Sequence, residues 1–299
     1  MNLLFTGASG FLGKNTLPIL KQQFETVHTL GLTENDRFCV NLSREIPQLS
    51  QPYDVVLHAA GKAHVVPRTE AEKKEFYDIN LTGTMNLCRA LEKVGAPKAL
   101  IFVSTVAVYG CDEGENISEE HPLDGDTPYA DSKKKAERFL TQWCDEHHVV
   151  LSIVRPCLLA GPNPPGNLGS MIRGISTGHY LSINKGQARK SVLMVQDIAR
   201  LVPLLAEKGG IYNVCDDEQP TFRQLEETIS HQLGKRPPIN IPYPLAKCLA
   251  LVGDCLGRKA PINSYKLRKI TRSLTFSNEK AKRELGWKPL NVVENFRIN

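Results

Sequence analysis

Five short apolar runs, each followed by a stretch long enough for a helix, most constrain the fold of this chain. The runs are mostly apolar, and Val, Ile, Leu and Phe make up about half of their positions. Strands of this kind are buried on both faces, which is typical of a parallel sheet covered by helices on both sides. The runs are NLLFTG, TVHTLGL, DVVLHAAG, ALIFVSTVAVYG and VVLSIVRP. The sequence therefore predicts an α/β fold with a doubly wound parallel sheet.

The pattern changes after Pro156. The segment GPNPPGNLGS is rich in Gly, Pro and Asn, and it predicts a long loop that leaves the sheet. A helix from about Val195 and the strand GIYNVCD then return to the sheet, and short helices with proline-rich links follow. We expect a sheet domain and a smaller C-terminal substrate-binding lobe, made respectively of residues 1–165 with about 191–235, and of about 166–190 with 236–299.

The composition is that of a globular protein with no nucleic-acid tail. Of 299 residues, 41% are hydrophobic and 23% are charged, and the net charge is +5. We interpret this positive excess as modest and spread along the chain, without the Lys/Arg block that binds nucleic acid. A small basic bias suits an anionic small-molecule substrate, so we expect no nucleic-acid partner.

The apolar segments do not predict membrane insertion. The N-terminal MNLLFTGASG lacks the basic region and long apolar stretch of a signal peptide. No segment approaches the roughly 18 apolar residues of a membrane span. The best candidate, YPLAKCLALVGDCLG, is interrupted by Lys247 and Asp254, and we interpret it as an amphipathic core helix, with contact to a membrane surface as the alternative.

The cysteines indicate a reducing compartment. They form no C-x-x-C pair and most lie in apolar segments, which favours free thiols in the cytoplasm over a disulfide framework. The pair His147 and His148 lacks the i, i+4 spacing of a helical zinc site, so we expect no metal. The eight cysteines are residues 39, 88, 111, 144, 157, 215, 248 and 255.

Three glycines follow the first apolar run and open the first helix. Gly7, Gly10 and Gly13 in FTGASGFLG have the spacing G-x-x-G-x-x-G. Glycines let the backbone turn tightly and approach a pyrophosphate, which then lies on the helix N-terminus. Position between a strand and a helix strengthens the signal, which predicts bound NAD or NADP.

The choice between NAD and NADP stays open at the second strand. An NAD site usually has an acid there for the ribose hydroxyl, but Gly31 occupies this point and no Asp or Glu is adjacent. Glycine leaves room for a 2′-phosphate, yet no Arg lies directly beside it. The nearest cations in the sequence are Lys14 and Arg37.

Tyr129 and Lys133 form a candidate acid/base pair. The i, i+4 spacing in PYADSKKKAE places both on one face of a helix. A lysine there can lower the pKa of the phenol from about 10 and make it a general acid or base. Thr105 lies within the fourth run, whose carboxyl end faces the cofactor in such folds, and its hydroxyl can polarise the same substrate oxygen.

Together these motifs resemble the extended short-chain dehydrogenase/reductase family, in its sugar-nucleotide epimerase/dehydratase branch. The resemblance covers almost the whole chain and implies an NAD(P)-binding Rossmann fold. It also implies a homodimer packed through helices such as 71–94 and 129–146. The matching segments, in order, are TGASGFLG, DVVLHAAG, INLTGTMNL, FVSTVAVYG, PYADSK, IVRP and SNEKAKRELGWKP.

The resemblance also implies roles for individual residues. Thr105, Tyr129 and Lys133 align with the catalytic residues, and Ser104 is interpreted as a supporting neighbour. Substrate contacts are expected from Thr105, Tyr129, Asn167 and Lys190, the last in place of an arginine that holds the diphosphate. Cofactor contacts are expected from Gly7, Ser9, Gly10, Phe11, Leu12, Gly13, Ala59, Ala60, Gly61, Asn80, Ser104, Tyr129, Lys133 and Pro156.

Two departures from the family pattern narrow the expected reaction. Val106 and Ala107 stand where 4,6-dehydratases have Asp and Glu, so we do not expect loss of water. The resemblance then favours a nucleotide-sugar 4-epimerase, with an NAD(P)H-dependent ketoreductase or dehydrogenase as the alternative. A non-catalytic NAD(P)-binding sensor is a third hypothesis, against which the retained Tyr129, Lys133 and Thr105 argue.

Overall fold

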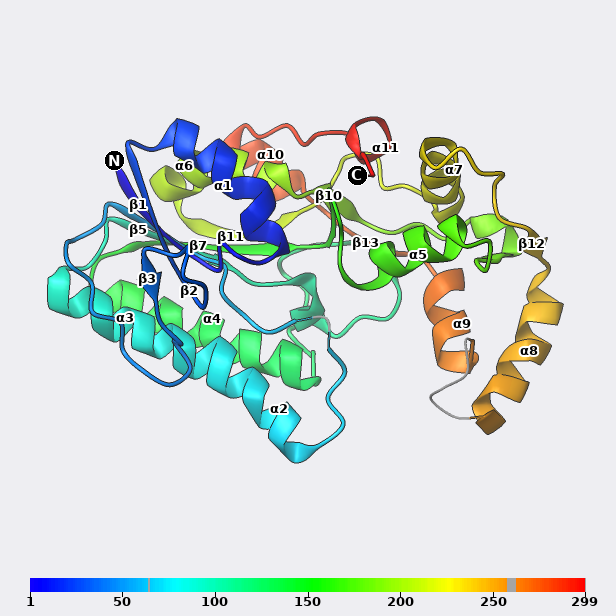
Figure 1. Ribbon diagram of the computed structural model, residues 1–299, viewed down its shortest axis with the longest axis horizontal. Coiled ribbons are helices and arrows are strands. Elements are labelled where there is room, and N and C mark those ends of the chain that lie inside the picture. Colours follow the sequence, from blue (N-terminus) through cyan, green and yellow to red (C-terminus); the bar gives the residue numbers. More distant parts are fainter. Residues whose placement is uncertain (64, 257–261, 299) are drawn as a thin grey trace.

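A seven-stranded parallel sheet forms the centre of the protein in a computed structural model (Figure 1), which describes residues 1–63, 65–256 and 262–298. The strand order is β3-β2-β1-β4-β5-β7-β11, and every neighbouring pair is parallel. This is the predicted α/β sheet. Its strands are β1 (Asn2–Thr6), β2 (Thr26–Gly31), β3 (Phe38–Cys39), β4 (Val55–His58), β5 (Ala99–Val103), β7 (Val150–Pro156) and β11 (Gly210–Val214).

Helices cover both faces of the sheet, which confirms the doubly wound prediction (Figure 1). On one face lie α1 (Phe11–Gln23), α6 (Gln196–Lys208) and α10 (Glu279–Leu285). On the other lie α3 (Gly83–Val94) and α4 (Pro128–Glu146). Side chains on both faces of the sheet therefore pack against helices, which explains why the strand sequences are mostly apolar.

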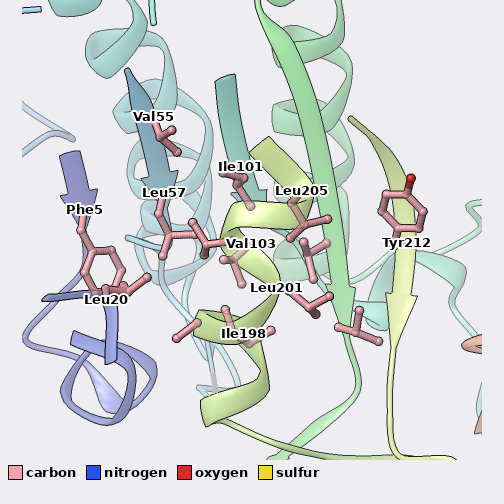
Figure 2. Close-up of a cluster of buried hydrophobic side chains, with 14 of the residues drawn as sticks. Phe5, Leu20, Val55, Leu57, Ile101, Val103, Ile198, Leu201, Leu205 and Tyr212 are labelled. Atoms are coloured by element: carbon pink, nitrogen blue, oxygen red, sulfur yellow. The ribbon is translucent and has the colours of Figure 1, made fainter. Parts of the chain in front are cut away.

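The larger core lies between the sheet, α1 and α6 (Figure 2). Phe5, Leu57 and Ile101 of the strands meet Leu201 and Leu205 of α6, and all five side chains are buried. Burying a side chain of this size contributes about 1.5–3 kcal/mol. Leu285 and Trp287 also belong to this core, so the C-terminal segment packs against the rest of the fold.

The direction in which successive strands are added to the sheet reverses between β1 and β4. β1 pairs with β2 on one side and with β4 on the other, so the first and second βαβ halves diverge from this point. Ligands of open parallel sheets bind outside the carboxyl ends of the strands at such a switch point. The loops after Thr6 and His58 therefore line the expected ligand site.

Two local elements differ from the sequence prediction. The expected single helix over 71–94 is α2 (Glu70–Tyr77), a π-helical turn η1 (Asp78–Thr82) and α3. The fourth strand ends at Val103, and a 3₁₀ turn η2 (Val106–Tyr109) follows it. Thr105 caps this turn by accepting a hydrogen bond from the Ala107 backbone N–H, at 3.1 Å. Both irregular turns lie beside the candidate site.

The smaller lobe is made of somewhat different segments from those predicted. α7 (Phe222–Gln232) packs its Leu225 and Ile229 on α5 (Gly166–Ser176), so it belongs to this lobe. α10 packs on the sheet instead, because Ala281 joins the larger core. The lobe also holds α8 (Tyr243–Leu256), α9 (Ser264–Thr271), α11 (Val292–Asn295) and the turn η3 (Asn184–Gly186). Three two-stranded pairs complete the fold: β8 (Leu158–Ala160) with β10 (Val192–Met194), β9 (Ser182–Ile183) with β12 (Asn240–Ile241), and β6 (Gly114–Ile117) with β13 (Leu274–Phe276).

The prediction that YPLAKCLALVGDCLG forms a core helix is wrong. The segment is helical as α8, but most of its surface faces outward, and Leu249 and Val252 are 44% and 60% exposed. Lys247 and Asp254 are also exposed, so the outer surface of α8 carries apolar residues together with these two charges. Within the described residues, no helix is long and apolar enough to cross a membrane.

Candidate active site

The glycine-rich turn has the close contacts that only glycine allows. Gly7 has φ +81°, and a Cβ on it would lie 2.7 Å from the Ala60 backbone nitrogen. A Cβ on Gly13 would lie 2.3 Å from the Ala8 carbonyl oxygen. Gly7 thus lets the turn touch the loop after β4, and Gly13 lets α1 pack against the turn.

The N-terminus of α1 is open to an anion. Gly10 is its N-cap and supplies no side-chain hydrogen bond, and Ser9 and Gly10 are exposed. The first amides of a helix need acceptors, and the helix dipole favours a negative charge there. Phe11 and Leu12 follow in the first turn. These residues fit a dinucleotide pyrophosphate in chemistry and in space.

Ala59 and Ala60 border the same turn from the end of β4. The Ala59 backbone N–H donates to the Thr6 carbonyl oxygen at 3.2 Å, and that of Ala60 donates to the Thr6 hydroxyl at 3.1 Å. Gly61 follows, where a Cβ would lie 3.1 Å from Lys133 Nζ and 3.0 Å from Asn80 Oδ1. The loop therefore joins the glycine-rich turn to the catalytic helix.

A carboxylate does lie at the end of β2, which the sequence did not reveal. A Cβ on Gly31 would lie 2.6 Å from Asp36 Oδ2, so the acid packs directly on the strand end. Residues 33–36 form a turn, in which Asp36 accepts hydrogen bonds from the Thr33 N–H at 3.1 Å and hydroxyl at 2.6 Å. The separation of five residues hid this acid from a search for one adjacent to Gly31.

Tyr129 and Thr105 meet across the carboxyl end of β5. Tyr129 lies in the first turn of α4, which begins with Pro128 and is capped by Thr127. Burial raises the pKa of Tyr129, and a hydrogen bond with the Thr105 hydroxyl opposes that rise. The phenol is therefore protonated at neutral pH and hydrogen-bonded to the hydroxyl predicted to act with it.

Lys133 lies beneath this pair, one helical turn after Tyr129. Its Nζ donates to the Val103 carbonyl oxygen at 2.9 Å and lies 4.5 Å from the centre of the Phe102 ring. Burial lowers the pKa of Lys133 to about 8, and Glu137 acts in the opposite direction. We predicted that Lys133 would lower the pKa of Tyr129. In this structure burial has the larger effect and the pKa of Tyr129 is raised.

Asn80 clamps the site from the π-helical turn η1. Its Oδ1 accepts from the Lys62 N–H at 2.7 Å, while its Nδ2 donates to the Lys62 carbonyl at 3.2 Å and to the Ser132 hydroxyl at 2.9 Å. Ser132 in turn donates to the Tyr129 carbonyl at 2.9 Å. Protein groups occupy its buried amide, so Asn80 positions α4, and the cofactor contact that we predicted for it stays a prediction.

A buried histidine supports this clamp. His58 Nδ1 is 2.7 Å from the Thr6 hydroxyl, and its Nε2 is 2.8 Å from the Thr84 hydroxyl, which donates to the Asn80 carbonyl at 2.7 Å. Burial, with a contribution from the charge of Lys133, lowers the pKa of His58 to about 3. The imidazole is therefore neutral and links β1 to η1.

Acid should destabilise the protein through His58. The unfolded histidine has a pKa of about 6.5, so below this pH the unfolded chain takes up a proton that the folded chain excludes. Between pH 6.5 and pH 3 the free energy of unfolding should fall by about 1.4 kcal/mol per pH unit from this group. Urea titrations of wild type and His58→Asn across this range measure the slope, which should be smaller in the variant. The exposed His179→Asn is the control, and equal slopes in wild type and His58→Asn would refute the assignment.

The Ser104 hydroxyl points toward α4. Its hydroxyl donates to Glu137, which also accepts from Arg155 Nε at 3.1 Å and Nη2 at 2.6 Å. Arg155 Nη1 donates to the Tyr109 hydroxyl at 3.0 Å. The hydroxyl of Ser104 thus joins the end of β5 to Glu137 of α4, and the cofactor contact that we predicted for Ser104 stays a prediction.

The remaining predicted residues lie at the edge of the site or in the smaller lobe. Pro156 is buried at the end of β7. Asn167 is exposed in the first turn of α5. Lys190 is half-buried, and burial followed by repulsion from Lys269 of α9 lowers its pKa to about 8, while Asp112 opposes this. Val106 and Ala107 form η2 directly after Thr105.

A doubly wound sheet with a glycine-rich turn at its switch point and a Tyr-x-x-x-Lys pair on α4 defines a dinucleotide-binding short-chain dehydrogenase/reductase. A family model described as the NAD dependent epimerase/dehydratase family matches residues 3–215. The chain therefore belongs to this family.

Relatives of known activity cover nearly the whole chain. N-acetyl-alpha-D-glucosaminyl-diphospho-ditrans,octacis-undecaprenol 4-epimerase of Escherichia coli O157:H7 is 29% identical, over 93% of this chain and 88% of that protein. UDP-glucose 4-epimerase of Vibrio cholerae is 26% identical over 98% and 92%. GDP-6-deoxy-D-mannose reductase of Pseudomonas aeruginosa is 30% identical over 76% and 79%.

A solved structure supports the fold. The crystal structure of UDP-glucose 4-epimerase from Thermotoga maritima with UDP-glucose has a TM-score of 0.75 and 21% identity, over 98% of this chain and 96% of that one. The Rossmann fold expected from the sequence is thereby confirmed.

Proposed function

We propose that this enzyme inverts the configuration at C4 of a diphosphate-linked sugar by oxidation and re-reduction. The observation that carries the proposal is the Tyr129–Thr105 hydrogen bond above a buried Lys133, at the carboxyl end of the sheet. The 4-epimerases among the relatives support this choice. Val106 and Ala107 support it further, because neither side chain can move the protons that a dehydratase must move.

Tyr129 serves as the acid and base of this reaction. As the sugar is oxidised, the phenolate form of Tyr129, which the positive charge of Lys133 would favour against the effect of burial, takes the proton of the C4 hydroxyl, and the resulting phenol returns a proton when the ketone is reduced. The Thr105 hydroxyl would donate its one hydrogen to the sugar oxygen, which polarises the bond that Tyr129 acts on. Lys133 supplies a positive charge beneath the phenol. A nicotinamide cofactor, when bound, would supply the hydride acceptor and donor that this reaction at C4 requires.

The glycine-rich turn, Ser9, and the Ala59–Gly61 loop would hold this cofactor, and Asp36 favours NAD. A carboxylate at the end of β2 accepts the ribose hydroxyls of NAD and repels a 2′-phosphate. Asp36→Asn should therefore reduce the preference for NAD over NADP by about tenfold. Titration of both cofactors by protein fluorescence measures this preference. Glu34→Gln, an exposed acid in the same loop, is the control. An unchanged preference in Asp36→Asn would contradict the assignment.

Retention of the cofactor tests the proposal directly. The purified enzyme should release stoichiometric NAD on denaturation and should interconvert two C4 epimers, UDP-glucose and UDP-galactose being the first pair to assay, without added cofactor. Enzymatic cycling measures the released NAD, and chromatography measures the epimers. An empty enzyme that consumes NADPH or NAD in proportion to product would instead establish the ketoreductase alternative, which the 30% identity to a GDP-sugar reductase supports.

The carrier of the sugar can be a nucleotide or a lipid. The relatives include a UDP-sugar epimerase and an epimerase whose sugar is joined through a diphosphate to undecaprenol. We propose that Lys190 and Asn167 face the diphosphate side, which both carriers share. A role in polysaccharide biosynthesis fits either carrier. Loss of affinity in Lys190→Met for UDP alone, measured by calorimetry, tests the contact.

We further propose a cytoplasmic homodimer. The eight free thiols support a reducing compartment. The dimer would pack through α2 and α4, which lie against each other on one face of the protein. Sedimentation velocity of the purified chain tests this state, and a monomer at micromolar concentration would exclude it.

A further inference from the structure

One helix of the smaller lobe exposes a continuous apolar face. α8 lies at the far edge of the lobe, beside α9 (Figure 1). Leu245, Leu251 and Val252 are 50%, 55% and 60% exposed, and Leu249 is 44% exposed. Cys248 and Cys255 are exposed beside them. A face of this size is unusual on a soluble surface and marks an interaction site.

The opposite side of α8 shows that packing in the lobe does not require this face. Ala246 and Ala250 are fully buried, and they pack with Leu267 of α9 and Ile183 of β9. On the same side, Asp254 accepts a hydrogen bond from the Ser264 N–H at 3.0 Å. Small residues thus bring α8 close to α9, while the large apolar residues point outward.

Positive charge is concentrated in the part of the sequence that contains α8. Our interpretation that positive charge is spread evenly along the chain is therefore wrong. Nine of the 37 Lys and Arg residues lie between residues 235 and 272, but only one of the 32 Asp and Glu residues does. This segment therefore carries +8, and the rest of the chain carries −3. The apolar face belongs to a basic segment, in which Arg268, Lys269 and Arg272 pair with Asp112 and Glu113 and partly offset the excess of positive charge.

We propose that α8 docks on the surface of an anionic lipid bilayer. An amphipathic helix lies in the interface with its apolar face among the acyl chains, and neighbouring Lys and Arg pair with anionic headgroups. The 14 residues of α8 suit an interfacial helix and are too few for a span. A second copy of the chain is a poorer occupant, because it would bring two segments of +8 together.

The docking surface is connected to the candidate diphosphate site. Lys269 of α9 lies close enough to Lys190 to interact with it electrostatically. A sugar diphosphate with its lipid tail in the bilayer would therefore meet Lys190 beside α9. This choice of carrier rests on the proposed function, whereas the docking itself does not.

Vesicle flotation of the full chain tests the docking. Wild type should float with vesicles of phosphatidylcholine and phosphatidylglycerol, and less with phosphatidylcholine alone or at high salt. The double variant Leu249→Ser and Val252→Ser should bind on the order of tenfold more weakly. Leu204→Ser removes an exposed leucine from α6 and should bind as wild type does. Because the changes are at exposed positions, thermal melting should be unaltered, and epimerisation of a soluble UDP-sugar should continue.

Three outcomes would overturn the proposal. They are failure of wild type to float with anionic vesicles, equal flotation of wild type and the double variant, and a dimer that the double variant abolishes without any vesicle binding. The last outcome would assign the face to a second copy. Since flotation requires no turnover, a failure here is distinguishable from failure of the proposed epimerisation.

Discussion

Tyr129→Phe should lower kcat by about 10²–10⁴-fold while leaving cofactor binding intact. The change removes one hydroxyl that exchanges the proton of the sugar oxygen, and general acid and base catalysis contributes about this much. The benzene ring stays, so the contact with Phe76, at 6.2 Å between ring centres, is retained. Steady-state kinetics on both epimers and fluorescence titration of NAD measure the two effects separately.

The matched control for this variant is Tyr77→Phe. Tyr77 donates a hydrogen bond to Asp131 of the same helix α4, at 2.9 Å, and stands outside the reacting groups. It should change kcat by no more than about twofold. Equal rates in Tyr129→Phe and wild type would remove Tyr129 from the mechanism, and loss of NAD binding would show a structural role instead.

Arg155→Met should cost about 3–5 kcal/mol of the free energy of unfolding. The Arg155 and Glu137 side chains are 3% and 6% exposed, and the change leaves the Glu137 carboxylate buried without its cation. Ser104 alone cannot compensate for that charge. The double variant with Glu137→Met should recover much of the loss, because both charges are then replaced by apolar groups of similar size. Urea unfolding of both single variants and the double variant measures the cycle.

An exposed pair provides the comparison. Arg223 and Glu227 form a similar contact at 2.6 Å, with side chains 40% and 51% exposed. Arg223→Met should cost less than about 1 kcal/mol, because water screens both charges. If Arg155→Met cost no more than Arg223→Met, the buried network would not hold β5 and α4 together.

The sheet and its turn were predictable because local patterns determine them. Each strand lies in a mostly apolar run of the sequence. The glycine spacing also has a local cause, because Gly7 and Gly13 make backbone contacts too close for a residue with a Cβ. Tyr129 and Lys133 could be paired because the helical repeat sets their spacing. The break of α2–α3 into a π-helical turn was not predictable from that repeat, since Asn80 gains its hydrogen bonds only from Lys62 and Ser132 of other elements.

Long-range contacts account for the remaining differences. Glu137 and Arg155 look like ordinary charged residues in the sequence, and only the adjacency of β7 and α4 shows them as a buried pair. Asp36 reaches Gly31 through a turn. The apolar face of α8 was missed because hydrophobicity alone does not distinguish a buried helix from an exposed one, although the local charge of residues 235–272 was visible in the sequence.

The fate of the hydrogen on C4 tests the central claim most directly. A sugar nucleotide with deuterium at C4 should be epimerised in ordinary water, and both epimers then examined by mass spectrometry and NMR. Transient oxidation keeps this hydrogen within the site as a hydride, so the account predicts full retention of deuterium at C4 in both epimers. Replacement of that deuterium by solvent hydrogen would contradict it, because the bond would then break by proton abstraction.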